Sequence, residues 1–257
     1  MLVFLFIVLI SIIIYILYNC YNEFQYNDDI EILQTGNFYK FYELTKKKYP
    51  TIMTNISNDI KNISINKLIK NNNDVIIKNN RNHFMKVDSI NTAINQKYLI
   101  KDDEIYKLFD KHFFQDIYKL SNLSKFNSDI IFNIGQKGPS DNLHYDLNHN
   151  MFLIQLSGKK KIILFNPKYK KYLYPIKNSN ENNCVYSLID YWKEETYKDL
   201  NLYNNAKYIE IILHEHQILY IPRLWWFVTE NLDDDNLTLT FKTNTIFSNI
   251  LNSFYHT

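Results

Sequence analysis

The stretch Asp141–Pro175 reads DNLHYDLNHNMFLIQLSGKKKIILFNPKYKKYLYP, and the rest of the chain can be organised around it. Within it, His144 and Asp146 are separated by one residue. Side chains two apart in an extended strand point to the same face, so an imidazole and a carboxylate would lie side by side. These groups form part of the 2-His-1-carboxylate triad that holds non-haem Fe(II). The spacing by itself also fits a surface histidine beside a turn aspartate.

Short apolar runs around this pair predict a mainly β fold. Met151–Leu156 and Lys161–Phe165 flank Ser157-Gly158, which predicts a hairpin. Many short strands with turn signals between them suit a small barrel or jelly roll. The other expected strands are 74–78, 128–134, 209–213, 218–221 and 237–243.

Three helices are expected to flank the strands. Apolar residues at helical spacing predict one at 105–120, and its acidic start complements the helix dipole. A second is predicted at 187–200, inserted before the last strands. The dozen residues that follow Asn244 suit one short helix.

A second block, Leu219–Asn244, reads LYIPRLWWFVTENLDDDNLTLTFKTN. With HYDLNHN, Gln155, GKKKIILFNP and LYP before it, this block resembles the JmjC and cupin-like hydroxylases. The nearest subgroup contains the asparaginyl hydroxylase that modifies the hypoxia-inducible factor. The resemblance covers 128–244. It implies a double-stranded β-helix, dioxygenase chemistry with Fe(II) and 2-oxoglutarate as cofactors, and a protein side chain as substrate.

The resemblance also assigns metal-ligand positions. His144 and Asp146 match the first two ligands. Phe227 stands directly after the paired tryptophans, Trp225 and Trp226, where the family has its second metal-binding histidine. A phenyl ring cannot coordinate iron, so the expected triad is incomplete. The two tryptophans are expected to be core and pocket-wall residues.

Two further residues match the family's cofactor site. Lys160 matches the lysine that pairs with the distal carboxylate of 2-oxoglutarate, and Asn150 matches an asparagine beside the site. Strand alternation would turn Lys160 inward and its neighbours Lys159 and Lys161 outward. The alternative for the three lysines is a solvated face, and for Asn150 one more asparagine in an Asn-rich chain.

Other positions depart from the family pattern. Asp141 stands where the close relative has a threonine that hydrogen-bonds 2-oxoglutarate, and a carboxylate there would repel an anionic co-substrate. Lys242 falls where that relative has an asparagine. Three other histidines are candidates for the missing ligand, and His216 is the most plausible of them by sequence: His149, His214 and His216.

Two classes of function follow. The first is a 2-oxoglutarate-dependent protein hydroxylase with an atypical or impaired metal site. The second is a binding or structural module that retains the barrel without iron chemistry. Phe227 favours the second, whereas the retained His144, Asp146 and Lys160 favour the first.

The N-terminal segment, residues 1–21, has no charged side chain and is long enough to span a bilayer as a helix. It lacks the basic region and small-residue cleavage site of a signal peptide, so an uncleaved single-pass membrane anchor is expected. The remaining residues, 22–257, are expected to form one domain, with 22–127 flanking a barrel core at 128–244. Acidic residues after the apolar segment favour a non-cytoplasmic domain.

Composition limits the possible partners. The chain has 29 Lys and Arg against 27 Asp and Glu, so no basic field indicates nucleic-acid binding. The expected partners are a membrane, through residues 1–21, and a protein substrate or ligand. With only Cys20 and Cys184, a disulfide framework is not expected.

Overall fold

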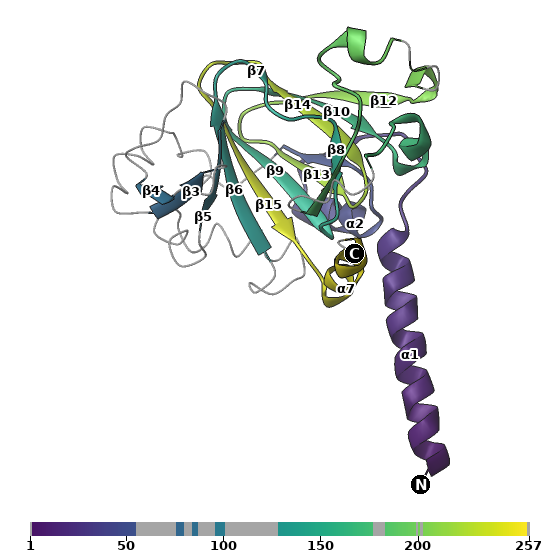
Figure 1. Cartoon of the computed structure of the whole chain (residues 1–257). Helices are drawn as coiled ribbons and strands as arrows, with labels where there is room; N and C mark the ends of the chain where they lie inside the picture. The colour runs from purple at the N-terminus through teal and green to yellow at the C-terminus, as the bar shows by residue number, and fades with distance from the viewer. Residues whose placement is uncertain are drawn as a thin grey trace.

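The structure is a computed structural model of the 257-residue chain. It describes residues 2–54, 76–79, 84–86, 96–100, 128–176, 183–198, 200 and 203–255. The helix expected at 105–120 lies outside these residues. Figure 1 shows a β-barrel domain from which one long N-terminal helix extends.

Two sheets form the domain. The first has nine strands, in the order β1 (Leu33–Thr35), β2 (Thr51–Met53), β13 (Ile218–Pro222), β9 (Asn150–Ser157), β15 (Asn236–Thr243), β6 (Ser128–Gly135), β5 (Gln96–Ile100), β3 (Ile76–Asn79) and β4 (Phe84–Lys86). The second has the order β11 (Cys184–Tyr186), β8 (His144–Asp146), β14 (Trp226–Asn231), β10 (Lys160–Phe165) and β12 (Tyr208–Leu213), and β7 (Gly138–Pro139) pairs with β14.

Helices are few among the described residues. The α-helices are α1 (Leu2–Phe24), α2 (Phe38–Lys46) and α7 (Ile246–Tyr255), and the last confirms the short helix expected after Asn244. Single 3₁₀ turns occur at Pro167–Tyr172, Glu194–Thr196 and Tyr203–Asn205. Asn37 begins α2 by accepting a hydrogen bond from the Lys40 amide through its side chain, which satisfies one of the free amides of the first turn.

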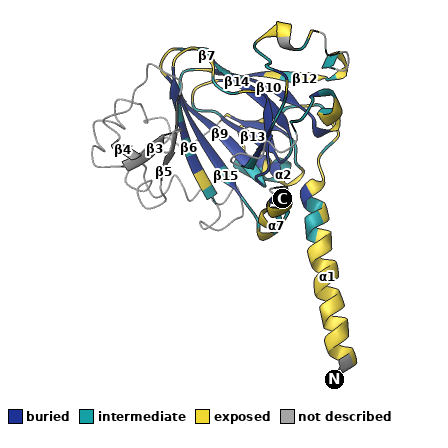
Figure 2. Ribbon diagram, viewed as in Figure 1, coloured by how far each residue is buried: buried dark blue, intermediate teal, exposed yellow. Residues whose placement is uncertain are grey.

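The core lies between the two sheets. Each strand sends alternate side chains to this side, so β14 turns Phe227 inward and the neighbouring Trp226 and Val228 to the opposite face. Figure 2 shows the central strands of both sheets as mostly buried. The inner cluster draws from both sheets: Ile52, Met151, Leu153, Ile162, Leu164, Ile211, Leu213, Leu219, Ile221, Trp225 and Phe227. This confirms that Trp225 and Trp226 are core residues, 1% and 0% exposed.

The prediction of a hairpin around Ser157-Gly158 is wrong. β9 pairs with β13 and β15 in one sheet, whereas β10 pairs with β12 and β14 in the other. Gly158 has φ +70°, a conformation that a side chain disfavours, and a Cβ there would lie 3.2 Å from the Asn236 side-chain nitrogen. The chain therefore crosses between the sheets at this glycine, and each strand finds partners distant in sequence.

The α-helix expected at 187–200 is also absent from the described part of that range. Ser187 forms an isolated bridge with Pro175, and only a 3₁₀ turn, Glu194–Thr196, follows. The Asp190 carboxylate accepts a hydrogen bond from the Trp192 amide, which stabilises a turn at that point. Tyr191, Trp192 and Tyr197 pack against the outer face of the second sheet. This tertiary packing outweighs the local helical pattern.

Helix α1 is fully exposed along its apolar length (Figure 2). Among the described residues it is the one helix long and apolar enough to cross a membrane, a property that a signal sequence shares. A water-exposed surface of this kind is unfavourable, because each apolar square ångström left in water costs about 25 cal/mol.

Candidate functional site

Strand pairing places the first predicted ligand beside Phe227. His144 on β8 lies directly opposite Phe227 on β14, and the two ring centroids are 4.2 Å apart. Both side chains are 4% exposed. The Nδ1 atom of His144 lies 2.7 Å from the Asn142 carbonyl oxygen, which can only accept a hydrogen bond, so Nδ1 carries a proton. In the neutral ring, Nε2 is the nitrogen left to accept or to ligate.

Asp146 is paired with a lysine from the opposite sheet. The Lys242 Nζ atom on β15 lies 2.8 Å from Asp146 Oδ2, and the two side chains are 13% and 5% exposed. Burial by itself would raise the pKa of Asp146, but the charges of Lys242 and His144 hold it below its usual value. The same pair raises the pKa of Lys242 against the opposing effect of burial. Both groups are therefore charged at neutral pH.

Cys184 provides a second contact to Asp146. It lies on β11, opposite Asp146 on β8, and its thiol donates a hydrogen bond to Asp146 Oδ1 at 2.7 Å. The ligating atoms of His144, Asp146 and Cys184 lie within 4.8 Å of one another, and all three residues are buried. An imidazole, a carboxylate and a thiol in this arrangement resemble three ligands of a tetrahedral metal site.

A small cavity lies next to this cluster. Its volume is about 30 Å³, room for roughly two water molecules and far below the roughly 300–1,000 Å³ of a typical small-molecule pocket. Both sheets contribute side chains to it. The lining residues are Ile131, Asn133, Asp141, His144, Met151, Leu153, Lys160, Phe227, Thr229, Thr240 and Lys242.

Lys160 lines this cavity and is 1% exposed, whereas Lys159 is exposed and Lys161 is half-buried. Its ammonium donates a hydrogen bond to the Ser140 hydroxyl at 3.3 Å. The Ser140 and Thr229 hydroxyls are 2.6 Å apart, and Thr229 donates to the Asp141 carboxylate at 2.7 Å.

The direction of this chain follows from its ends. Asp141 can only accept and the Lys160 ammonium can only donate, so Ser140 donates to Thr229 and Thr229 to Asp141. Two hydroxyls thus connect a buried cation to a carboxylate. Asp141, the departure from the family threonine, is an internal counter-charge for Lys160.

The other candidate residues are not brought to this cavity. Asn150 begins β9, and its side-chain oxygen accepts a hydrogen bond from the Tyr220 hydroxyl at 3.1 Å. His149 pairs with Glu23 at 2.8 Å. His214 is exposed, and His216 lies in a turn with φ +64°, 3.7 Å from Glu215. Within the described residues, none of these three histidines joins His144 and Asp146.

The residues present do not fit an Fe(II) facial triad. Phe227 offers no lone pair, and the Lys242 ammonium already neutralises the carboxylate that a metal would need. A divalent cation near Asp146 would also be repelled by this ammonium. The fit of 2-oxoglutarate is equally poor, because the cavity holds little more than water and Lys160 has an internal partner.

Two contacts at the site were not predicted from sequence. Cys184 is 38 residues from Asp146 and Lys242 is 96 residues away, so neither pair leaves a local spacing signal. The useful signals were indirect. Lys242 departs from a family asparagine, and an additional buried lysine needs an anion partner.

Two facing sheets around a cavity with a His-x-Asp pair define a double-stranded β-helix of the cupin class. Residues 25–256 match the family model described as "Cupin-like domain", and the chain belongs to that family. The JmjC and cupin-like resemblance is thereby confirmed, as is the mainly β jelly-roll fold.

Curated relatives match smaller parts of the chain. JmjC domain-containing protein D of Dictyostelium discoideum is 40% identical over 99 residues, 38% of this chain and 21% of that protein. HSPB1-associated protein 1 of Rattus norvegicus is 30% identical over 100 residues, 39% of this chain and 21% of that protein. The tRNA wybutosine-synthesizing protein 5 of Mus musculus is 36% identical over 99 residues, 37% of this chain and 28% of that protein. The aligned part is thus under a third of each relative.

Proposed function

We propose that this chain is a membrane-anchored cupin-like protein whose iron site has been replaced by an internal ion pair, so that the barrel acts as a protein-binding module with little or no oxygenase turnover. The observation that carries the proposal is the 2.8 Å pair between Lys242 and Asp146. Lys242 supplies at this carboxylate the positive charge that a metal ion supplies in a working site. Phe227 beside His144 supports the same conclusion.

The membrane part of the proposal rests on α1. It is 23 residues long, and none of its apolar stretch is buried inside the domain. About 20 apolar residues suffice to cross the hydrocarbon core of a bilayer. The HSPB1-associated relative supports a protein as the partner.

Cys184 favours a second candidate function, an atypical metal-dependent oxygenase. In that case His144, Asp146 and Cys184 would hold the ion, and Lys242 would have to leave Asp146. This candidate requires the cavity to enlarge before a co-substrate enters.

Calorimetric titration of the full chain in detergent, under anaerobic conditions, tests both candidates. We expect no binding of Fe(II) in this titration and, in a separate assay with oxygen present, no formation of succinate from 2-oxoglutarate by the wild-type protein. The double variant Phe227→His with Lys242→Met should gain Fe(II) binding, because it restores a third ligand and removes the competing ammonium. The matched control, Lys242→Met alone, also lacks the ammonium but keeps the phenyl ring of Phe227 and should not bind.

Wild-type metal binding would contradict the proposal. If Cys184→Ala abolished that binding, the second candidate would replace it. Turnover of 2-oxoglutarate that requires His144 would show a working oxygenase.

A further inference from the structure

Helix α7 buries two polar residues and turns three apolar residues outward, with Asn249 and Ser253 exposed beside them. Ser248 and Asn252 are 0% and 5% exposed, whereas Ile246 and Phe254 are each 70% exposed and Ile250 is 38% exposed. The three apolar residues are spaced four apart and therefore lie along one face. Neither Asp, Glu, Lys nor Arg occurs in the helix. A helix on a water-soluble domain shows the opposite arrangement.

One residue of the inward polar side is hydrogen-bonded to the barrel. The Asn252 side-chain oxygen accepts a hydrogen bond from Arg223 at 2.9 Å, and Arg223 also donates to the Leu147 carbonyl. At the first turn, Ser248 and Thr245 exchange side-chain to backbone hydrogen bonds of 2.8 and 2.9 Å. These contacts fix which face of α7 points outward. Its apolar face is therefore presented by the fold and is not a consequence of fraying.

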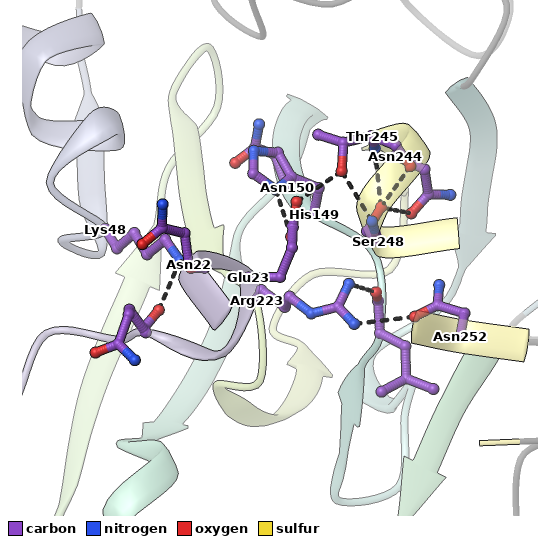
Figure 3. A network of polar contacts seen from close by, with 12 residues as sticks. Asn22, Glu23, Lys48, His149, Asn150, Arg223, Asn244, Thr245, Ser248 and Asn252 are labelled. Atoms are coloured by element: carbon purple, nitrogen blue, oxygen red, sulfur yellow. Dashed lines mark hydrogen bonds and ion pairs between the residues drawn. The ribbon is translucent and has the colours of Figure 1, made fainter. Parts of the chain in front are cut away.

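The end of α1 is attached beside α7 by a network of polar contacts (Figure 3). Glu23 accepts a hydrogen bond from Thr245 at 2.6 Å and pairs with His149 at 2.8 Å. Lys48 donates to the carbonyl oxygens of Asn22 and Gln25, each at 2.6 Å, at the C-terminal end of α1, where a cation is favourable. The orientation of α1 against the barrel is thus held by contacts on several sides.

The two helices also touch further along α1. The rings of Tyr15 on α1 and Phe247 on α7 are 5.9 Å apart and nearly perpendicular. Tyr15, Tyr18 and Tyr21 are all more than 60% exposed, and tyrosines are typical of the boundary between lipid and water. At 1.5 Å per residue, Tyr15 lies about 9 Å below Tyr21 along α1.

The depth at which α7 lies along α1 matches that of an interfacial helix. Residues 2–21 would cover about 30 Å, the thickness of the hydrocarbon core, which places Tyr21 near its edge. Phe247 contacts Tyr15, so α7 reaches below that edge by several ångströms. Amphipathic helices in the interface bury their apolar face by about 5–10 Å.

We propose that α7 is an interfacial membrane helix, with Ile246, Ile250 and Phe254 inserted at the boundary between lipid headgroups and acyl chains. This inference rests on the proposed membrane anchoring by α1. The occupant of the apolar face is the bilayer because the face is continuous with α1, whose own exposed surface requires lipid. The barrel then has one fixed orientation on the membrane, set by two helices and the contacts of Glu23.

Quenching of tryptophan fluorescence by brominated lipids tests this inference on the full chain in phosphatidylcholine vesicles at low protein-to-lipid ratio. Three single variants are compared after subtraction of the wild-type signal. Phe254→Trp reports on α7, Leu9→Trp on the middle of α1, and Leu188→Trp, 64% exposed on the barrel, is the matched control. All three positions are exposed, so no core packing is lost.

We expect quenching of Phe254→Trp to be strongest when bromine lies near the glycerol end of the acyl chain. Leu9→Trp should be quenched most by bromine deep in the acyl chain. Leu188→Trp should be quenched by bromine at neither position. If Leu9→Trp is quenched and Phe254→Trp is not, the inference for α7 is overturned and the anchoring by α1 stands. A second copy of the chain that covers the apolar face of α7 would give this result. No quenching of Leu9→Trp would instead disprove the anchoring on which it rests.

Discussion

Replacement of Lys242 by methionine should destabilise the domain strongly. Methionine keeps most of the side-chain volume and removes the charge, so Asp146 is left as a buried carboxylate, 5% exposed, without its cation. Breaking a buried pair by removing one partner costs about 3–5 kcal/mol. For a domain of this size, each kcal/mol lowers the melting temperature by about 2–4 °C. The expected decrease is therefore roughly 6–20 °C.

Thermal unfolding of the full chain in detergent, followed by tryptophan fluorescence, measures this decrease. The matched control is Lys161→Met, which removes an ion pair with Glu210 whose side chains are 27% and 48% exposed. An exposed pair contributes about 0–1 kcal/mol, so the control should melt within a few degrees of wild type. Adding Asp146→Asn to Lys242→Met should recover most of the loss, because the uncompensated charge is removed.

The pH dependence of this difference follows from the two pKa shifts. Asp146 has a lowered pKa, so its contribution is present above its usual pKa and is lost as the pH falls through the folded value. Lys242 has a raised pKa, so its contribution persists at neutral pH and is lost only as the pH rises through the folded value. The difference between wild type and Lys242→Met should be largest near neutral pH and should shrink as the pH falls, because burial without the Lys242 charge raises the pKa of Asp146 in the variant. Equal melting of Lys242→Met and Lys161→Met would refute the ion-pair argument.

Three further predictions concern the metal site, Asp146 and the crossing between the sheets. Fe(II) at 100 times its dissociation constant should stabilise Phe227→His with Lys242→Met by about 2.7 kcal/mol, measured as a melting shift, and leave wild type unchanged. Cys184→Ala should lower the free energy of unfolding by about 1.5–3 kcal/mol, because it removes a hydrogen bond to a charged group. Cys184→Ser should lower it less, because serine keeps a donor. Equal losses of stability in the two variants would contradict the hydrogen bond. Gly158→Ala should cost about 1–2 kcal/mol in chemical unfolding, because a side chain at φ +70° is strained and would crowd Asn236; an unchanged stability would show that the crossing tolerates a side chain.

Much of the fold could be predicted because its signals are local. Alternation along a strand is a property of two neighbouring residues, so it correctly turned Lys160 inward and Lys159 outward before any partner strand was known. The tyrosine-proline and tryptophan motifs identified the family, and Phe227 was found at the position beside His144 because motif spacing carries over within a family. That Phe227 occupies the position of the family's third metal ligand stays a prediction.

The errors occurred where distant segments compete with local pattern. Met151–Leu156 and Lys161–Phe165 have the lengths and turn residues of a hairpin, yet each strand pairs in a different sheet. The region 187–200 has helical spacing, but its aromatic side chains gain more by packing on the second sheet. Local propensity is worth a fraction of a kcal/mol per residue, and burial of a large aromatic side chain is worth several times more.

The sequence by itself determined the family, the alternation of the strands, a phenylalanine directly after the paired tryptophans and a helix able to cross a membrane. These depend on residue type and short spacing. The tertiary structure alone decided that Lys242 neutralises Asp146, that Cys184 contacts the same carboxylate, and that α7 buries Ser248 and Asn252. Each of these joins residues far apart in the chain, and Coulomb and hydrogen-bond energies depend on distances in space that no spacing in sequence encodes.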